Sequence, residues 1–116
     1  MKRTMNLLPQ VSFSILMALS LKPRHGYEIM QQVEDDSLGK IKLGPGSLYT
    51  AIKQLKEDDY IEEVPDSDIR RRYYRLSKKG WDRLNAELEY FDKTMKIAKQ
   101  RKVFEAFLGS DLTWIS

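Results

Sequence analysis

The sequence contains no cysteine and only one histidine among its 116 residues. Without a thiol there can be no disulfide, no thiolate metal site and no cysteine nucleophile, and a reducing, cytoplasmic location fits. The histidine, His25, precedes Gly26 at the expected start of a helix, where packing or capping explains it better than catalysis. The segment LGPGS lacks the lysine of a phosphate-binding loop. We therefore expect no enzyme, no cofactor and no metal site.

A long hydrophobic run is also missing. The apolar stretch at 11–21 is interrupted by Ser12 and Ser14 and is too short to span a bilayer, so we expect no membrane partner. Preceded by Lys2 and Arg3, it imitates a secretory leader. From Val11 and Ile15 onward, apolar residues recur at helical spacing, and additional apolar residues widen this face to most of the helix circumference. We therefore interpret the stretch as a buried first helix.

Glycine and proline divide the following residues into short helices. The apolar spacing predicts a second helix over 25–36, ending before Gly39, and a third over 45–59. In the third helix Leu48, Ile52 and Leu55 share one face, and Ser47 is expected to cap the start.

The pattern of residues 60–76 predicts a β-hairpin. Aromatic and β-branched residues occupy two arms, 60–64 and 73–76, joined by the turn formers of 65–68. The first arm continues an acidic block, and the second follows three consecutive arginines, so charges can pair across the strands. Because side chains alternate along a strand, both faces should keep guanidinium groups after this pairing.

A long helix is predicted from Ser77, a favourable N-cap. Apolar residues then alternate by four and three, which is typical of a coiled-coil seam. With two positions of the first helix, the expected dimer interface is Val11, Ile15, Leu84, Leu88, Phe91, Met95 and Ala98. The alternative is that this helix packs on the core of its own chain. The apolar tail at 103–108 is expected to return to the same interface.

These elements predict a mainly α fold with a two-stranded β wing: a winged helix-turn-helix domain over 1–76 and a C-terminal dimerisation helix and tail over 77–116. The outward face of the third helix offers hydroxyls and lysines, and the wing offers arginine forks; both suit phosphate oxygens. The candidate DNA-binding residues are Ser47, Tyr49, Thr50, Lys53, Lys56, Arg70, Arg71, Arg72 and Arg75. An ordinary amphipathic helix beside a solvated, internally paired ribbon is the alternative interpretation.

The segments HGYEI at 25–29, GSLYTAIKQL at 46–55 and RRRYYRLSKKG at 70–80 occur in this order and together resemble the short-tailed branch of the PadR family, bacterial winged-helix transcriptional regulators. The resemblance implies a homodimer, usually a repressor, with the third helix in the major groove and the wing against the DNA backbone. It implies DNA contacts from Tyr49 and from basic wing residues such as Arg71 and Arg72. It also implies dimerisation through the last helix packed with the first.

Two departures from the family pattern affect the backbone. The family usually has glycine where this chain has Asp59, and again at the wing tip, where this chain has Ser67 and Asp68. Aspartate tolerates left-handed backbone better than most residues, so we expect the fold to persist, while the family pattern no longer determines the helix end or the wing shape.

Some members of the family bind flat aromatic or cationic ligands between subunits. Tyr90 and Phe91 lie on or beside the seam, so a planar aromatic effector is one hypothesis, and a closed interface with stacked Phe91 rings is the other. We predict a DNA-binding regulator acting as a homodimer. The alternative function is a winged-helix protein-interaction module without specific DNA binding.

Overall fold

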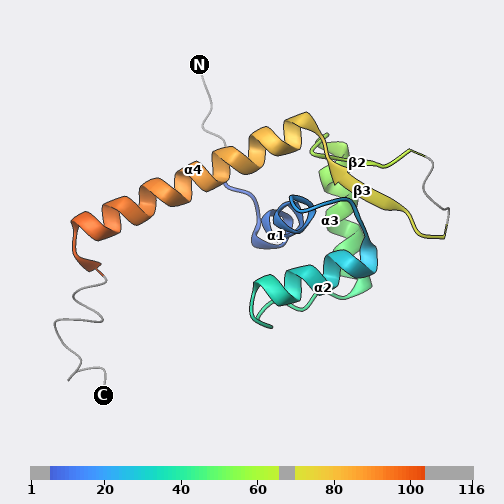
Figure 1. Cartoon of the computed structure of the whole chain (residues 1–116), viewed down its shortest axis with the longest axis horizontal. Coiled ribbons are helices and arrows are strands. Elements are labelled where there is room, and N and C mark those ends of the chain that lie inside the picture. Colours follow the sequence, from blue (N-terminus) through green and yellow to red (C-terminus); the bar gives the residue numbers. More distant parts are fainter. Residues whose placement is uncertain (1–5, 66–69, 104–116) are drawn as a thin grey trace. The chain divides into compact units, whose positions relative to one another are not determined.

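The computed structural model describes residues 6–65 and 70–103 (Figure 1). Residues 66–68 of the expected turn at 65–68, and the tail beyond Val103, lie outside these residues. The elements are α1 (Gln10–Leu19), β1 (Arg24–His25), α2 (Gly26–Asp36), α3 (Pro45–Glu57), β2 (Ile61–Glu63), β3 (Tyr73–Leu76) and α4 (Lys78–Gln100). This order confirms the predicted winged helix-turn-helix. Residues up to Asn85 form one compact unit, and residues from Ala86 onward form another.

The core of the first unit surrounds α1, which contacts α2, α3 and β3 (Figure 1). Ile15 and Leu16 are fully buried, as the interpretation of a buried first helix requires. Among the described residues, no helix is both long and apolar enough to cross a membrane. The remaining buried core residues are Ala18, Leu19, Ile29, Val33, Leu48, Ile52, Leu55, Tyr60, Ile61, Tyr74, Leu76 and Leu84.

The sheet is antiparallel and has three strands in the order β1-β3-β2. The hairpin of β2 and β3 was predicted, and its register places Ile61 opposite Leu76 and Glu63 opposite Tyr74. Strand β1 was not predicted. It is two residues long and pairs Arg24 with Tyr74 on the other side of β3. The wing is therefore attached to the segment that leads into α2.

The start of α3 differs from the prediction. The helix begins at Pro45, with Gly44 as its N-cap and without a side-chain capping bond, so the expected cap from Ser47 is wrong. Proline at the first helical position has its φ angle already set for the helix and has no N–H to leave unsatisfied. Ser47 consequently lies inside the first turn, where its side chain is exposed.

The end of α3 has the hydrogen bonds of a Schellman motif. The Asp59 N–H donates to the Lys56 carbonyl at 2.9 Å, and the Tyr60 N–H donates to the Leu55 carbonyl at 2.9 Å. Asp59 has a φ of 63°, in the left-handed region that glycine usually occupies. Aspartate thus takes over the conformational role of the glycine found in the family.

Ser77 connects the end of α3 to the start of α4. Its hydroxyl donates to the Asp59 carbonyl at 2.5 Å and accepts the Gly80 N–H at 3.0 Å, which confirms Ser77 as the N-cap of α4. A Cβ atom on Gly80 would lie 2.0 Å from the carbonyl oxygen of Tyr60. Only glycine permits this close approach, because the obstructing atom belongs to the backbone.

The end of α2 carries a strained leucine. The Gly39 N–H donates to the Glu34 carbonyl at 2.8 Å, and the preceding Leu38 N–H donates to the Asp35 carbonyl at 3.1 Å. Leu38 has a φ of 55°, and its side chain is 88% exposed. A leucine in left-handed backbone that buries no apolar surface gains nothing locally to offset the steric cost.

Candidate nucleic-acid interface

Helix α3 divides into a buried and an exposed face, as predicted. Leu48, Ile52 and Leu55 are at most 3% exposed. The opposite side carries hydroxyls, lysines and one tyrosine, with Tyr49 half exposed. The predicted residues Ser47, Tyr49, Thr50, Lys53 and Lys56 are all exposed. This face can donate hydrogen bonds to phosphate, while its short or flexible side chains are poorly suited to bidentate contacts with bases.

A polar hollow of about 260 Å³ adjoins this face. Its lining residues are His25, Gly26, Tyr27, Tyr49, Arg70, Arg71 and Arg72. The Tyr49 hydroxyl lies so close to the start of α2 that a Cβ atom on Gly26 would be 2.4 Å from it. The first N–H groups and the positive end of the α2 dipole lie at this position. The hollow therefore brings together arginines, a phenol hydroxyl and a helix N-terminus from three separate segments.

His25 has structural contacts at the edge of this hollow. Its backbone N–H donates to Glu28 Oε1 at 3.2 Å, which is one half of a capping box. The imidazole ring meets the Tyr73 ring edge to face, with centroids 5.2 Å apart. Packing and capping thus account for His25, as predicted. Within 6–65 and 70–103, no group of three potential metal ligands comes together.

Charge pairs cross the wing in the way that the sequence predicted. Arg75 Nε donates to Glu62 Oε2 at 2.8 Å, between residues that are partners in the strand register. Glu63 forms ion pairs with Arg72, at 3.5 Å, and with Lys56 of α3, at 3.0 Å. The hydrogen bond from Lys56 is the largest effect on Glu63 and lowers the pKa of its carboxyl.

Arg71 differs from these paired residues. It is exposed and forms no ion pair with any other residue in the part of the chain that the structure describes. Together with Arg72 it lines the polar hollow, so these two arginines are placed where an anion beside Tyr49 would meet them. An arginine already bound to a carboxylate must share or exchange that partner to bind phosphate, whereas Arg71 need not.

A second hollow, of about 360 Å³, separates α3 from the wing. It is lined by Tyr49, Ile52, Lys53, Lys56, Glu57 and Tyr74. Burial is the main cause of the raised pKa of Tyr74, and the charge of Glu63 raises it further, so this phenol stays protonated at neutral pH. Tyr49 lines both hollows and therefore stands at the centre of the candidate interface.

Residues 15–86 match the family described as Transcriptional regulator PadR-like. The chain belongs to this family. The match covers the second half of α1, the residues lining both hollows and the first part of α4. It confirms the family recognised from the three sequence segments.

Two solved structures have a similar fold over most of the chain. A PadR family transcription regulator from hypervirulent Clostridium difficile is 25% identical, with a TM-score of 0.66, covering 79% of this chain and 97% of that one. RosR of H. salinarum is 25% identical, with a TM-score of 0.68, covering 90% and 93%. An uncharacterized protein of Lysinibacillus sphaericus is 32% identical over 72 residues, which are 58% of this chain and 65% of the relative. The chain thus spans less than two thirds of that relative.

The predicted dimer residues of this PadR-like chain have different surroundings. Ile15 and Leu84 are buried in the core of their own chain, with at most 2% of their surface exposed, so almost no area is left there for a partner. In the second unit Leu88, Phe91 and Met95 are 38%, 39% and 43% exposed. Val11 and Ala98 have intermediate exposure. Among the predicted dimer residues, the accessible apolar surface therefore lies mainly at Leu88, Phe91 and Met95.

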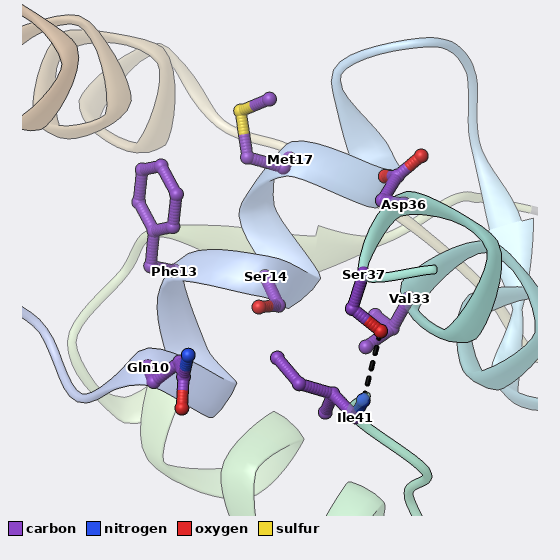
Figure 2. A pocket seen from close by; sticks show the side chains of 8 residues that line it. All are labelled: Gln10, Phe13, Ser14, Met17, Val33, Asp36, Ser37 and Ile41. Carbon is purple, nitrogen blue, oxygen red and sulfur yellow. Dashed lines mark hydrogen bonds between the residues drawn. The ribbon is translucent and has the colours of Figure 1, made fainter. Parts of the chain in front are cut away.

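Another hollow, between α1 and the end of α2, was not predicted (Figure 2). It measures about 290 Å³ and is lined by Gln10, Phe13, Ser14, Met17, Val33, Asp36, Ser37 and Ile41. The Ile41 N–H donates to the Ser37 hydroxyl at 2.8 Å across one side of it (Figure 2). No lysine or arginine lines this hollow, in contrast to the hollows beside Tyr49.

Proposed function

We propose that this PadR-like protein binds double-stranded DNA as a homodimer and represses transcription by occupying an operator with two half-sites. The observation that carries the proposal is the position of Tyr49, between the exposed lysines of α3 and the hollow lined by three arginines. In this arrangement α3 enters the major groove, and the wing follows the backbone. The chemistry is binding only, and we expect it to take place in the cytoplasm.

Phosphate contacts account for most of the proposed affinity. Tyr49, Lys53 and Arg71 present donors to phosphate oxygens, and these contacts position the protein without reading sequence. Base reading is left to the few other exposed groups of α3. Gln54 is exposed, and its amide lies 3.3 Å from both Asp58 carboxylate oxygens, so reading adenine requires that amide to leave Asp58. We therefore expect modest base specificity from direct contacts.

The homodimer is proposed from the exposed apolar residues of the second unit. Leu88, Phe91 and Met95 follow the four-three spacing of a seam, and each exposes more than a third of its surface. Monomers seldom leave such a stripe in water, and a two-fold dimer can cover it. A two-fold dimer would also place two copies of α3 about one turn of DNA apart, which predicts a pseudo-palindromic operator.

A planar aromatic effector at this interface stays a prediction. The rings of Tyr90 and Phe91 meet edge to face with centroids 5.5 Å apart, and both are partly exposed. Aromatic faces of this kind suit a flat ligand, and they equally suit stacking against a second copy. Binding of planar dyes, measured as one site per dimer, separates the two arrangements.

A salt titration tests DNA binding against the alternative of a protein-interaction module. After selection of an operator from random duplexes, the dissociation constant is measured at several salt concentrations for the wild type and for Arg71→Ala with Arg72→Ala. The slope of log K against log salt should fall by about 0.9 for each lost phosphate contact, hence by up to about 2 in the double variant. The matched control, Lys93→Ala with Lys96→Ala, removes the same charge from α4.

Two results would contradict the proposal. An equal fall in slope for the control would mean that the arginines act only through net charge. A wild-type protein whose DNA affinity is weak and independent of salt would instead favour the protein-interaction module, because the charge pairs of the wing would then be purely internal.

A further inference from the structure

The carboxylate of Glu63 connects the two elements that the proposed function places against DNA. Glu63 is the last residue of β2 and lies opposite Tyr74, so its side chain is on the sheet face that carries the buried tyrosine. Its Oε1 atom accepts from Lys56 Nζ at 3.0 Å and lies 3.5 Å from Arg72 Nη1. One oxygen therefore faces a cation of α3 and a cation of the wing.

Glu63 is charged when DNA would bind. The hydrogen bond from Lys56 lowers the pKa of the carboxyl from its ordinary value of 4.5, so the group is ionised at neutral pH. Its side chain is 34% exposed, and those of Lys56 and Arg72 are 40% and 56% exposed, so a phosphate can reach both cations. Carboxylate and phosphate oxygens compete for the same donors, since both are anionic acceptors of Lys and Arg.

Glu62 provides an internal comparison. It precedes Glu63 on the same strand, and its carboxylate binds Arg75 at 2.8 Å. That pair lies within the hairpin, with the two side chains 47% and 44% exposed, and it does not reach α3. Removing either carboxylate changes the net charge equally. Removal of Glu62 releases one cation, Arg75, whereas removal of Glu63 releases both Arg72 and Lys56 of α3.

We propose that Glu63 is an internal competitor of DNA phosphate, which occupies Lys56 and Arg72 in the free protein and lowers the affinity for every DNA sequence. This inference rests on the proposed DNA-binding function. A phosphate that approaches Lys56 or Arg72 must displace the Glu63 oxygen or share the cation with it. Each of these two phosphate contacts therefore contributes less to the free energy of DNA binding than a contact with an unpaired cation. Because phosphate contacts carry no sequence information, operator and unrelated DNA are affected alike.

The test compares Glu63→Gln with Glu62→Gln in DNA titrations with operator and unrelated duplexes. Release of two surface ion pairs should tighten binding of Glu63→Gln to both duplexes by about five- to tenfold, with a steeper salt dependence. Glu62→Gln should gain less than half of this factor. In a background of Lys56→Ala with Arg72→Ala, Glu63→Gln should change affinity by less than about twofold, because no competition is left to relieve.

Other outcomes overturn the inference. Equal gains from both glutamine variants, or a gain from Glu63→Gln that persists in the alanine background, would reduce Glu63 to a contribution to net charge. Weaker binding by Glu63→Gln, with an unchanged far-ultraviolet spectrum, would make it a residue that positions α3 and the wing for DNA. In both cases the wild type still binds DNA with salt dependence, so the proposed function stands; a wild type that does not bind DNA rejects both.

Discussion

A methyl group at Gly26 should weaken DNA binding by moving Tyr49. In Gly26→Ala the new Cβ would lie 2.4 Å from the Tyr49 hydroxyl and 3.1 Å from Leu48 Cδ2. Because carbon and oxygen atoms in contact are normally about 3.5 Å apart, the hydroxyl must retreat by about 1 Å. It can do so, since it is the far end of a half-exposed side chain. The fold should therefore tolerate alanine at this position.

The expected loss follows from one hydrogen bond. A bond from a hydroxyl to a charged phosphate contributes about 1.5 kcal/mol, and an affinity change of that size is about tenfold. Tyr49→Phe removes the same donor without moving the ring and should cost the same factor. Stability should change little in Gly26→Ala, because the nearest obstructing atom is the far end of the Tyr49 side chain and not backbone.

A double-mutant cycle decides whether both changes act on the same atom. Fluorescence anisotropy with a labelled operator gives the dissociation constants of Gly26→Ala, Tyr49→Phe and the double variant, and thermal unfolding confirms that each is folded. The double variant should bind DNA no more weakly than whichever single variant binds more weakly. Once Tyr49→Phe has removed the hydroxyl, Gly26→Ala has no hydroxyl left to displace. Losses that multiply to about 100-fold, or wild-type affinity of Gly26→Ala, would refute the position assigned to Tyr49.

Two further predictions concern stability and assembly. Leu38→Gly should raise the free energy of unfolding by about 0.5 to 1 kcal/mol and the melting temperature by about 2 to 6 °C, because it relieves left-handed strain at an exposed site. Leu38→Ala, which keeps the Cβ atom, should show no such rise in the same melting experiment. Leu88→Asp should place a charge in the proposed dimer interface and give monomers or insoluble protein, whereas Lys93→Asp should not; a soluble Leu88→Asp dimer in sedimentation would rule out the seam.

Periodicity explains why most elements could be predicted. Helix α3 was correctly divided because Leu48, Ile52 and Leu55 repeat at helical spacing, and all three are buried. The hairpin was predicted from two β-branched and aromatic arms, and the strand register pairs their charges as expected. These signals are local, and the sequence contains them in full.

The features that were missed depend on neighbours far along the chain. Strand β1 has only two residues, so it shows no alternation, and its partners in β3 follow much later. The two hollows beside Tyr49 combine separate segments, which no single window of sequence reveals. The seam pattern also cannot distinguish Leu84 from Leu88, although the first is buried in its own chain and the second is 38% exposed. Periodicity identifies an apolar face but does not say what covers it.

Because strand β1 pairs with β3, we expect that neither α3 nor the wing can fold as an isolated fragment. Pairing of Arg24 with Tyr74 closes the winged-helix unit between its first and last thirds, and such non-local contacts form late and slowly during folding. A fragment that stops before Tyr73 would leave β1 unpaired and would lack the core side chains of Tyr74 and Leu76. An isolated hairpin is marginal in water, so the excised wing would fare no better. We therefore expect α3 and the wing to fold as one cooperative unit, so that neither one can be cut out as a minimal DNA-binding peptide.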